Sequence, residues 1–266
     1  MDSRWCEAPP STASSSGSAR PDYENPVARV NPFLLVSYLV TDRVERRSTV
    51  PCRLGEEYGK IRDYVAARGC INTRTKALYP PTGLPEGVSF GDFDGGYAAM
   101  QNELELAALI CVLLQYGPFR SSLDIGVGSG GSTRMIRDLI PIEETVVIDD
   151  GSNEDYQHWV KAKPHIKSKL TEIIGDSTSR EVAQQLADLG KKFDLIAIDG
   201  AHDLPHVMND WNLVAQHAME GAIVWFHDIV IIRDVTSVWK HASCHFPVIY
   251  ERYIEQGTGA IILLGT

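Results

Sequence analysis

The chain has 266 residues, of which 44% are hydrophobic and 23% charged, so it is long enough to bury a core and is neither collagen-like nor wholly disordered. Its 25 basic and 35 acidic residues give a formal net charge of −10, which disfavours nucleic acid as a partner. Five cysteines without a CxxC pair, no membrane-length apolar run and no secretory signal predict a reduced, cytoplasmic protein without a membrane span.

The first 95 residues are predicted to precede the main domain. Residues 1–30 include a stretch rich in Ser, Ala and Pro and are predicted to be a disordered tail. Residues 31–95 are predicted to form an appendage with a helix from Glu56 to Arg68, followed by a segment rich in Pro and Gly. That segment is long enough for a lid over a substrate, and a plain surface connector explains it equally well.

Residues 96–266 alternate between helical and strand patterns. A helix is predicted from Tyr97 to Tyr116, because apolar residues recur at helical spacing and Gly117 and Pro118 follow. Short β-branched runs then alternate with amphipathic segments, which is typical of a parallel sheet flanked by helices. The predicted strands are 122–125, 145–148, 170–174, 193–198 and 222–226, and the helices between them are 132–139, 154–162, 179–189 and 204–219.

Local signals mark the last predicted helix and the end of the chain. Asp203 is suited to be the N-cap of that helix, and Gly221 is expected just beyond its end. The C-terminal residues are predicted to form two antiparallel strands joined at Gly257, Thr258 and Gly259.

Each of the five predicted parallel strands ends in or beside an acidic residue. Ligands of such sheets bind beyond the carboxyl ends of the strands, so these side chains are expected to meet at one edge. Carboxylates there suit hydroxyl groups, amines or a metal ion, and they do not suit a bare phosphate. The residues are Asp124, Asp149 with Asp150, Asp176, Asp199 and Asp228.

The loop after the first strand is rich in glycine, so that backbone can approach a ligand closely. Its glycines are Gly126, Gly128, Gly130 and Gly131. Three of them also fit the GxGxxG pattern of dinucleotide-binding folds, and an NAD-dependent oxidoreductase is therefore an alternative. The acidic strand ends disfavour it, because a pyrophosphate would face too much negative charge.

These motifs resemble those of class I S-adenosylmethionine-dependent methyltransferases, and more closely the small-molecule O-methyltransferases that include macrolide-sugar and catechol enzymes. The resemblance rests on DIGVGSG from Asp124, GDS at 175–177, and FDLIAIDGAH followed by GAIVWFHD. It covers roughly two thirds of the chain, from Gly96 onward. It implies an α/β, Rossmann-like, doubly wound and mostly parallel seven-stranded sheet, with an antiparallel last strand, helices on both faces and an N-terminal appendage.

The resemblance also implies S-adenosylmethionine as cofactor and assigns residues to its parts. Asp124 and the glycines of the loop, Gly126, Gly128 and Gly130, would hold the methionine portion. Asp149 would hold the ribose hydroxyls, with Asp150 as the less favoured neighbour. Asp176 and Ser177 would face the adenine edge.

His202 and Asp199 are the candidate catalytic residues, because they match the base and metal-carboxylate positions of the family. An imidazole is mismatched with a phenol by roughly 3.5 pKa units, or about 5 kcal/mol, and a divalent Mg²⁺ or Mn²⁺ ion on the acceptor oxygen would offset that gap. The expected metal ligands are Asp199, His227 and Asp228. Metal-dependent relatives usually have two acidic residues, or an acidic residue and an amide, where this chain has His227 and Asp228. A metal-assisted and a metal-free reaction are therefore both kept as alternatives.

The sequence thus predicts a cytoplasmic S-adenosylmethionine-dependent O-methyltransferase whose partner is a small-molecule acceptor, a sugar or a natural product. Besides the oxidoreductase, a non-catalytic cofactor-binding relative is an alternative, and a homo-oligomer is left open. His206 and Asp210, four residues apart on the last predicted helix, are expected to form a surface pair.

Overall fold

The computed structural model describes residues 51–68 and 99–264, with side chains from residue 56 onward. The chain divides into two compact units, Met1–Glu56 and Glu57–Thr266, and the architecture below is that of the second. The predicted tail and most of the predicted appendage and lid lie outside the described residues, so the domain boundaries at residues 30 and 95 stay predictions. No helix within the described ranges is long and apolar enough to cross a bilayer.

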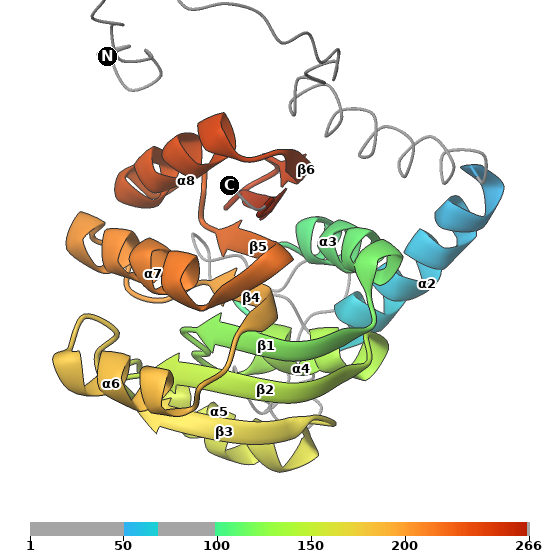
Figure 1. Ribbon diagram of the computed structural model, residues 1–266. Coiled ribbons are helices and arrows are strands. Elements are labelled where there is room, and N and C mark those ends of the chain that lie inside the picture. The colour runs from blue at the N-terminus through green and yellow to red at the C-terminus, as the bar shows by residue number, and fades with distance from the viewer. Residues whose placement is uncertain (1–50, 69–98, 265–266) are drawn as a thin grey trace, which may run out of the picture. The chain divides into compact units, whose positions relative to one another are not determined.

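One sheet is formed by strands β1 (Phe119–Ile125), β2 (Ile142–Asp149), β3 (Lys169–Ile174), β4 (Phe193–Ile198), β5 (Ala218–His227), β6 (Val248–Arg252) and β7 (Thr258–Ile262). The order is β3-β2-β1-β4-β5-β7-β6 (Figure 1). Strands β1 to β5 run parallel, and β7 is antiparallel to both β5 and β6. The predicted seven-stranded sheet is confirmed. Its strand order reverses at β1 and β4, the place where ligands bind in open α/β sheets.

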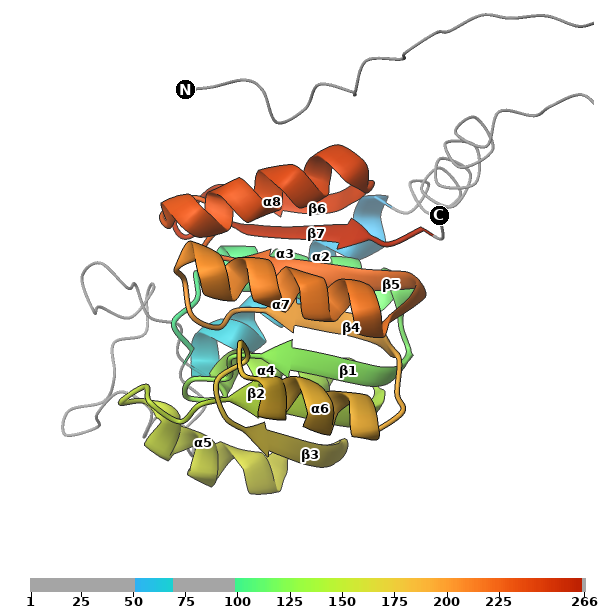
Figure 2. The same cartoon turned by 60° about the vertical axis from the view of Figure 1, so that its left-hand side comes forward.

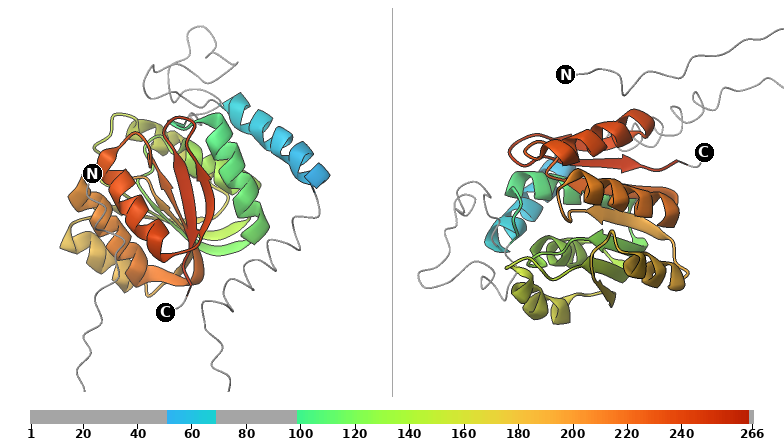
Figure 3. Two further views of the ribbon diagram at one scale, coloured as in Figure 1. Left: turned by 90° about the horizontal axis from the view of Figure 1, so that it is seen from above. Right: turned by 90° about the vertical axis from the view of Figure 1, so that its left-hand side faces the viewer.

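The helices of the described residues are α2 (Pro51–Arg68), α3 (Glu103–Tyr116), α4 (Gly131–Leu139), α5 (Tyr156–Ala162), α6 (Arg180–Asp188), α7 (Leu204–His217) and α8 (Arg233–His245). Helices α6, α7 and α8 pack on one face of the sheet (Figure 2). Helices α2, α3, α4 and α5 pack on the other, and two further views show the sheet between these groups (Figure 3). Helices therefore cover both faces, as predicted.

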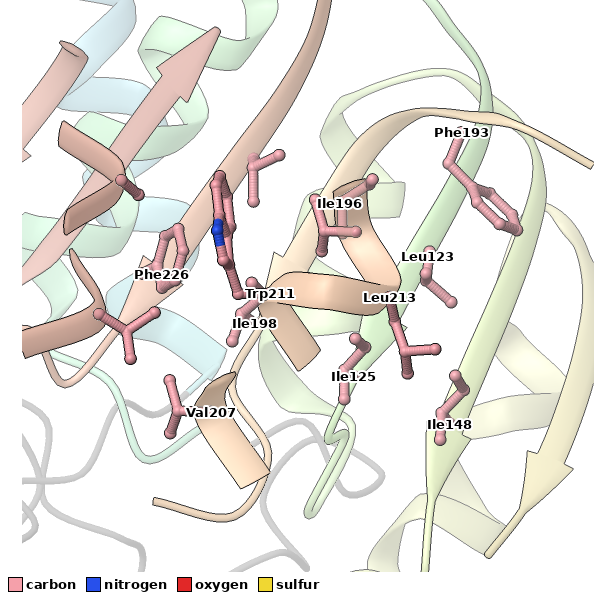
Figure 4. Close-up of a cluster of buried hydrophobic side chains, with 14 of the residues drawn as sticks. Leu123, Ile125, Ile148, Phe193, Ile196, Ile198, Val207, Trp211, Leu213 and Phe226 are labelled. Carbon is pink, nitrogen blue, oxygen red and sulfur yellow. The ribbon is translucent and has the colours of Figure 1, made fainter. Parts of the chain in front are cut away.

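The core has one apolar cluster on each face of the sheet because successive strand residues point to opposite faces. In β4, Ile196 and Ile198 belong to the cluster under α6, α7 and α8, whereas Leu195 and Ala197 belong to the opposite cluster. Figure 4 shows the first cluster, in which the ring of Trp211 packs on strand residues. Because these strands are buried on both faces, a slip by one residue would move every side chain into the opposite cluster and disrupt the packing of both, so the carboxyl ends of β1, β4 and β5 are held in register.

The structure corrects the expected boundary between α7 and β5. The helix predicted to reach residue 219 ends at His217, and β5 begins at Ala218 instead of residue 222. Gly221 therefore lies inside β5, where its φ of 78° accompanies irregular pairing with β4, and it caps no helix. The predicted N-cap is confirmed, since the Asp203 side chain accepts a hydrogen bond from the His206 backbone N–H.

Two further corrections concern the C-terminal elements. Helix α8 was not among the predicted helices, because its sequence RDVTSVWKHASCH contains many residues of low helix propensity and its stability comes from packing. Thr258 and Gly259 belong to β7, so the turn between the last two strands lies at residues 253–257.

Candidate functional site

A cavity of about 490 Å³ opens at the carboxyl ends of the parallel strands. The loops after β1, β2, β3, β4 and β5 all contribute to its wall, as the strand order predicts. Most of the predicted site residues meet on this wall: Gly126, Gly128, Asp149, Asp150, Asp176, Ser177, Asp199, His202, His227 and Asp228. Asp124 and Gly130 are not among the residues that line the cavity.

The glycine loop after β1 is shaped by close backbone packing. Gly126 has a φ of 83°, and a Cβ there would lie 2.1 Å from the backbone oxygen of Asp199. Gly130 has a φ of 80° and is the N-cap of α4, and a Cβ on it would meet the Trp159 ring at 2.4 Å. Both positions therefore require glycine, the first for the approach of β1 to β4 and the second for the packing of α5.

Asp149 holds the glycine loop in place. Its Oδ2 accepts the backbone N–H groups of Val127 at 2.8 Å and Gly128 at 3.3 Å, while Oδ1 accepts that of Gly151 at 2.8 Å. The carboxylate is mostly buried and lies on the cavity wall between the ends of β1 and β2. Asp149 thus fixes the loop, and its remaining acceptor capacity faces a site suited to hydroxyl donors.

Asp124 lies beneath the loop and not on the cavity surface. Its Oδ1 is 2.5 Å from the guanidinium of Arg137, and its Oδ2 accepts a hydrogen bond from the Thr133 hydroxyl at 2.8 Å. Both members of the ion pair are almost fully buried, and Arg137 also reaches the hydroxyls of Ser122 and Thr145. Asp124 therefore ties β1 to α4, and the described geometry gives it no direct contact with a ligand in the cavity.

At the end of β3, Asp176 has an exposed carboxylate on the cavity wall. Hydrogen bonds from the Thr178 side chain and backbone lower the pKa of Asp176. His206 lies between two carboxylates, with Nδ1 2.6 Å from Asp203 and Nε2 3.5 Å from Asp176. The predicted surface pair of His206 and Asp210 is wrong, because Asp210 is fully buried.

Four ionisable side chains meet at the ends of β4 and β5. Nδ1 of His227 lies 3.0 Å from Oδ1 of Asp199 and 3.1 Å from Oδ2 of Asp228, and Nε2 of His202 lies 3.1 Å from the same Asp228 oxygen. Among the described residues, Asp228 is the one non-glycine residue with a positive φ, 59°, and this conformation turns the chain sharply at the end of β5.

The carboxylates favour positive charge on both imidazoles. Burial lowers the pKa of His227, but the charges of Asp199 and Asp228 outweigh it and raise that pKa well above its ordinary value. A hydrogen bond with Asp228 raises the pKa of His202 against the opposing effect of burial. Burial raises the pKa of Asp228, yet His227 and His202 outweigh it and hold the pKa below its usual range.

The geometry changes one member of the expected metal set. One donor atom from each of Asp199, His202 and Asp228 lies within 4.8 Å of the others, which fits a small divalent cation with oxygen and nitrogen ligands. His227 does not belong to this convergent group, because its Nδ1 already faces both carboxylates. The convergent group therefore contains His202 in place of the expected ligand His227.

Two buried glutamines on the cavity wall were missed. Gln101 donates through Nε2 to Oδ2 of Asp199 at 3.2 Å, and Gln256 donates through Nε2 to the Met100 carbonyl at 2.8 Å. Gln101 lies two residues before α3 and Gln256 in the turn before β7, and neither is part of a recognisable motif. The signal that could have found Gln101 is the following Asn102, whose side chain caps α3 and brings this segment to the strand ends.

Residues 123–229, which begin within β1 and extend just past the end of β5, match a family model described as a methyltransferase domain. No curated protein is significantly similar to the chain in sequence.

Solved structures of several methyltransferases are similar to the chain. NodS, an N-methyltransferase of Bradyrhizobium japonicum WM9, has 14% identity over 60% of this chain and 94% of its own, with a TM-score of 0.45. An O-methyltransferase from Bacillus cereus has 14% identity over 58% of this chain and 79% of its own, with a TM-score of 0.44. TomG, an O-methyltransferase of Streptomyces achromogenes involved in tomaymycin synthesis, has 17% identity over 59% of this chain and 77% of its own, with a TM-score of 0.43.

Proposed function

Because residues 123–229 form a methyltransferase domain, we propose that this chain transfers a methyl group from S-adenosylmethionine to a hydroxyl group of a small molecule, with His202 as general base. The domain match confirms the resemblance to class I S-adenosylmethionine-dependent methyltransferases drawn from the sequence motifs, and it disfavours the NAD-dependent alternative. A sugar or a natural product is the class of acceptor we propose.

The observation that carries this proposal is that one cavity holds both the glycine loop and the cluster of Asp199, His202 and Asp228. The loop and Asp149 offer backbone and carboxylate groups for a nucleoside cofactor without phosphates. The cluster offers a base and two carboxylates for an acceptor hydroxyl at the neighbouring strand ends. A cofactor and an acceptor in one cavity are what a direct transfer requires.

A sulfonium methyl group is already activated, so the protein has to align the acceptor oxygen and remove its proton. A C–O bond forms as the C–S bond breaks, the electron pair of that bond stays on sulfur, and S-adenosylhomocysteine is the product. Nε2 of His202 faces Asp228, which stabilises the tautomer protonated at that nitrogen. Nδ1 of His202 is then the nitrogen that takes the proton of the acceptor.

A divalent Mg²⁺ or Mn²⁺ ion is the second part of the proposal. Asp199 and Asp228 would hold it, because such ions commonly bind through one or two carboxylates and complete their shell with water or substrate. The ion would supply Lewis-acid stabilisation of the acceptor oxygen. One nitrogen of His202 cannot be both ligand and base, so we assign the two carboxylates to the metal and Nδ1 of His202 to the proton.

Two measurements test the proposed function. Calorimetric titration with S-adenosylhomocysteine and, separately, with NAD(H) is expected to give binding of the first and none of the second. Incubation with methyl-labelled S-adenosylmethionine and a panel of sugars and phenols is expected to place the label on an oxygen. Binding of NAD(H) in place of S-adenosylhomocysteine would overturn the proposal, and cofactor binding without transfer to any member of the panel would favour a non-catalytic relative.

A further inference from the structure

Three donor groups converge on one oxygen of the Asp176 carboxylate, at the end of β3. Oδ1 accepts the backbone N–H and the hydroxyl of Thr178, each at 2.7 Å, and Nε2 of His206 lies 3.5 Å from the same oxygen. Asp176 is on the cavity wall, and its side chain is 48% exposed. These contacts leave Oδ2 as the oxygen that can accept a hydrogen bond from a ligand in the cavity.

His206 comes from α7 and holds Asp176 from outside its own loop. Its Nδ1 lies 2.6 Å from Oδ2 of Asp203, and that nitrogen carries a proton because two lone pairs would repel each other at this distance. Asn209, one turn further along α7, donates from Nδ2 to the carbonyl oxygen of Ser177 at 2.6 Å. Two side chains of α7 thus fix the loop that follows β3, one through a carboxylate and one through the backbone.

The charge of His206 decides whether its Nε2 attracts or repels Asp176. With both ring nitrogens protonated, the imidazolium forms ion pairs with Asp176 and Asp203. In the neutral ring the remaining proton stays on Nδ1 beside Asp203, so Nε2 presents a lone pair to a carboxylate oxygen that also only accepts. Loss of the charge therefore removes the restraint that His206 places on the Asp176 carboxylate.

Among the described residues, three carboxyl groups act on the charge of His206. Asp203 raises the pKa of His206, burial opposes it, and Asp176 adds to the increase. The third is Asp210, which is fully buried one turn further along α7 and interacts electrostatically with His206. Hydrogen bonds from Thr178 and the pair with His206 hold the pKa of Asp176 below its usual range. Between pH 6 and 8.5, His206 is therefore the member of the pair that titrates.

The order of the strands places Asp176 at the nucleobase end of the proposed cofactor. Transfer requires the sulfonium to lie beside the cluster of Asp199, His202 and Asp228, at the ends of β4 and β5. Asp149, which suits ribose hydroxyls, is at the end of β2, and β3 is the next strand outward. A nucleoside that begins at the sulfonium and passes Asp149 therefore ends with its base at β3. There the 6-amino group of adenine is a donor for Oδ2 of Asp176.

We infer that His206 is a positioning residue for the cofactor, because its imidazolium holds Asp176 in the direction in which Oδ2 accepts from the adenine amino group. This inference rests on the proposed function. It makes the affinity for the cofactor depend on pH, with tighter binding at lower pH, since the ion pair is present when the imidazole is charged and is lost when it becomes neutral. His206 acts through Asp176 and takes no part in methyl transfer.

The test is the Kd of S-adenosylhomocysteine for the full chain, measured by calorimetry at pH 6 and at pH 8.5. We expect the wild type to bind about two- to fivefold more weakly at pH 8.5, the range for a partly exposed ion pair. His206→Gln cannot be charged and Asp176→Asn cannot form the ion pair, so each should lose this difference. The controls are His165→Gln, an exposed histidine outside the cavity wall, and Asp210→Asn, and both should keep the difference.

Loss of the difference in the variants of His206 and Asp176, with both controls unchanged, supports the inference. Thermal unfolding checks each fold, and because the two variants change opposite members of the pair, the test stands if one of them does not fold. Equal affinities of the wild type at the two pH values, tighter binding at pH 8.5, or a His206→Gln that keeps the difference overturns the inference, while the proposed function stands. Loss of the difference in Asp210→Asn would assign it to Asp210 and also overturn the inference. If the wild type does not bind S-adenosylhomocysteine at either pH, the proposed function fails, and the inference falls with it.

Discussion

Nδ1 of His227 lies 3.0 Å from Oδ1 of Asp199, and this contact joins the buried end of β5 to the end of β4. The same nitrogen faces Asp228 at 3.1 Å, so a positive imidazolium compensates two carboxylates that would otherwise repel each other. The arrangement holds the carboxylates close together and open toward the cavity, where His202 and an acceptor can reach them.

Metal removal tests the role of these carboxylates. We expect exhaustive treatment with EDTA to lower the rate of methylation and added Mg²⁺ or Mn²⁺ to restore it, because an ion would offset much of the pKa mismatch between His202 and the acceptor. Calorimetric titration with Mn²⁺ should show binding to the wild type and none to Asp228→Asn. Full activity after EDTA treatment, with no Mn²⁺ binding, would remove the metal from the mechanism.

Substitution of the proposed base and its neighbour separates catalysis from cofactor binding. Asp199→Asn and His202→Gln should each lower kcat by about 10²–10⁴ while the Kd of S-adenosylhomocysteine stays largely unchanged. Because a base must be neutral and the pKa of His202 is raised, the wild-type rate should increase with pH above the ordinary histidine value of 6.5. Retained turnover in both variants contradicts the assignment of the site.

Gly126→Ala should disrupt the cofactor end of the cavity. Its Cβ would lie 2.1 Å from the Asp199 backbone oxygen, and either β1 or β4 would have to move. Gly190→Ala is the matched control, because Gly190 also has a positive φ, 60°, but nothing lies within 4 Å of its Cβ position. We expect S-adenosylhomocysteine binding to be lost in the first variant and kept in the second, and equal affinities in both would contradict the packing argument.

The ion pair of Asp124 and Arg137 is predicted to support the fold instead of contacting a ligand. Arg137→Met leaves a buried carboxylate without its partner and should lower the free energy of unfolding by about 3–5 kcal/mol. The double variant Asp124→Leu with Arg137→Met should recover much of this loss and still bind S-adenosylhomocysteine. Denaturant titration measures the free energy of unfolding, and calorimetry measures the binding of S-adenosylhomocysteine. A stable double variant that no longer binds S-adenosylhomocysteine would indicate that Asp124 contacts the ligand.

Asp210 is predicted to make stability depend on pH. Burial raises the pKa of Asp210 from 3.8 to about 6, so the folded state holds the proton more tightly than the unfolded state. The protonated Asp210 carboxyl makes its full contribution to the free energy of unfolding below pH 3.8. This contribution is lost as pH rises through about 6, which lowers the free energy of unfolding by about 3 kcal/mol. Asp210→Asn should lack this decrease, unlike the exposed control Asp188→Asn. The free energy of unfolding is measured by denaturant titration at pH 5 and at pH 8. An equal change between the two pH values for wild type and Asp210→Asn would contradict the prediction.

The sequence by itself determined the α/β class, the strands β1 to β4 and the row of acidic residues at their carboxyl ends, because these depend on local periodicity and on a topological rule. It did not predict α8, whose residues have weak helix propensity and depend on packing against β5 and β7. The end of α7 was misplaced because Gly221 is a helix-ending signal that here serves an irregular strand pairing.

Within the site, residue type and spacing were enough to bring Asp149, Asp199, His202 and Asp228 to one edge of the sheet. The Asp124 carboxylate could have faced the cavity, but it faces the buried Arg137. This is a matter of side-chain direction, and only the tertiary structure decided it. The roles of His227 and the two glutamines were decided in the same way. Gln101 and His227 each contact Asp199, and Gln256 contacts Met100. These partners are distant in sequence, so the contacts exist only after the strands and the turn before β7 have packed together.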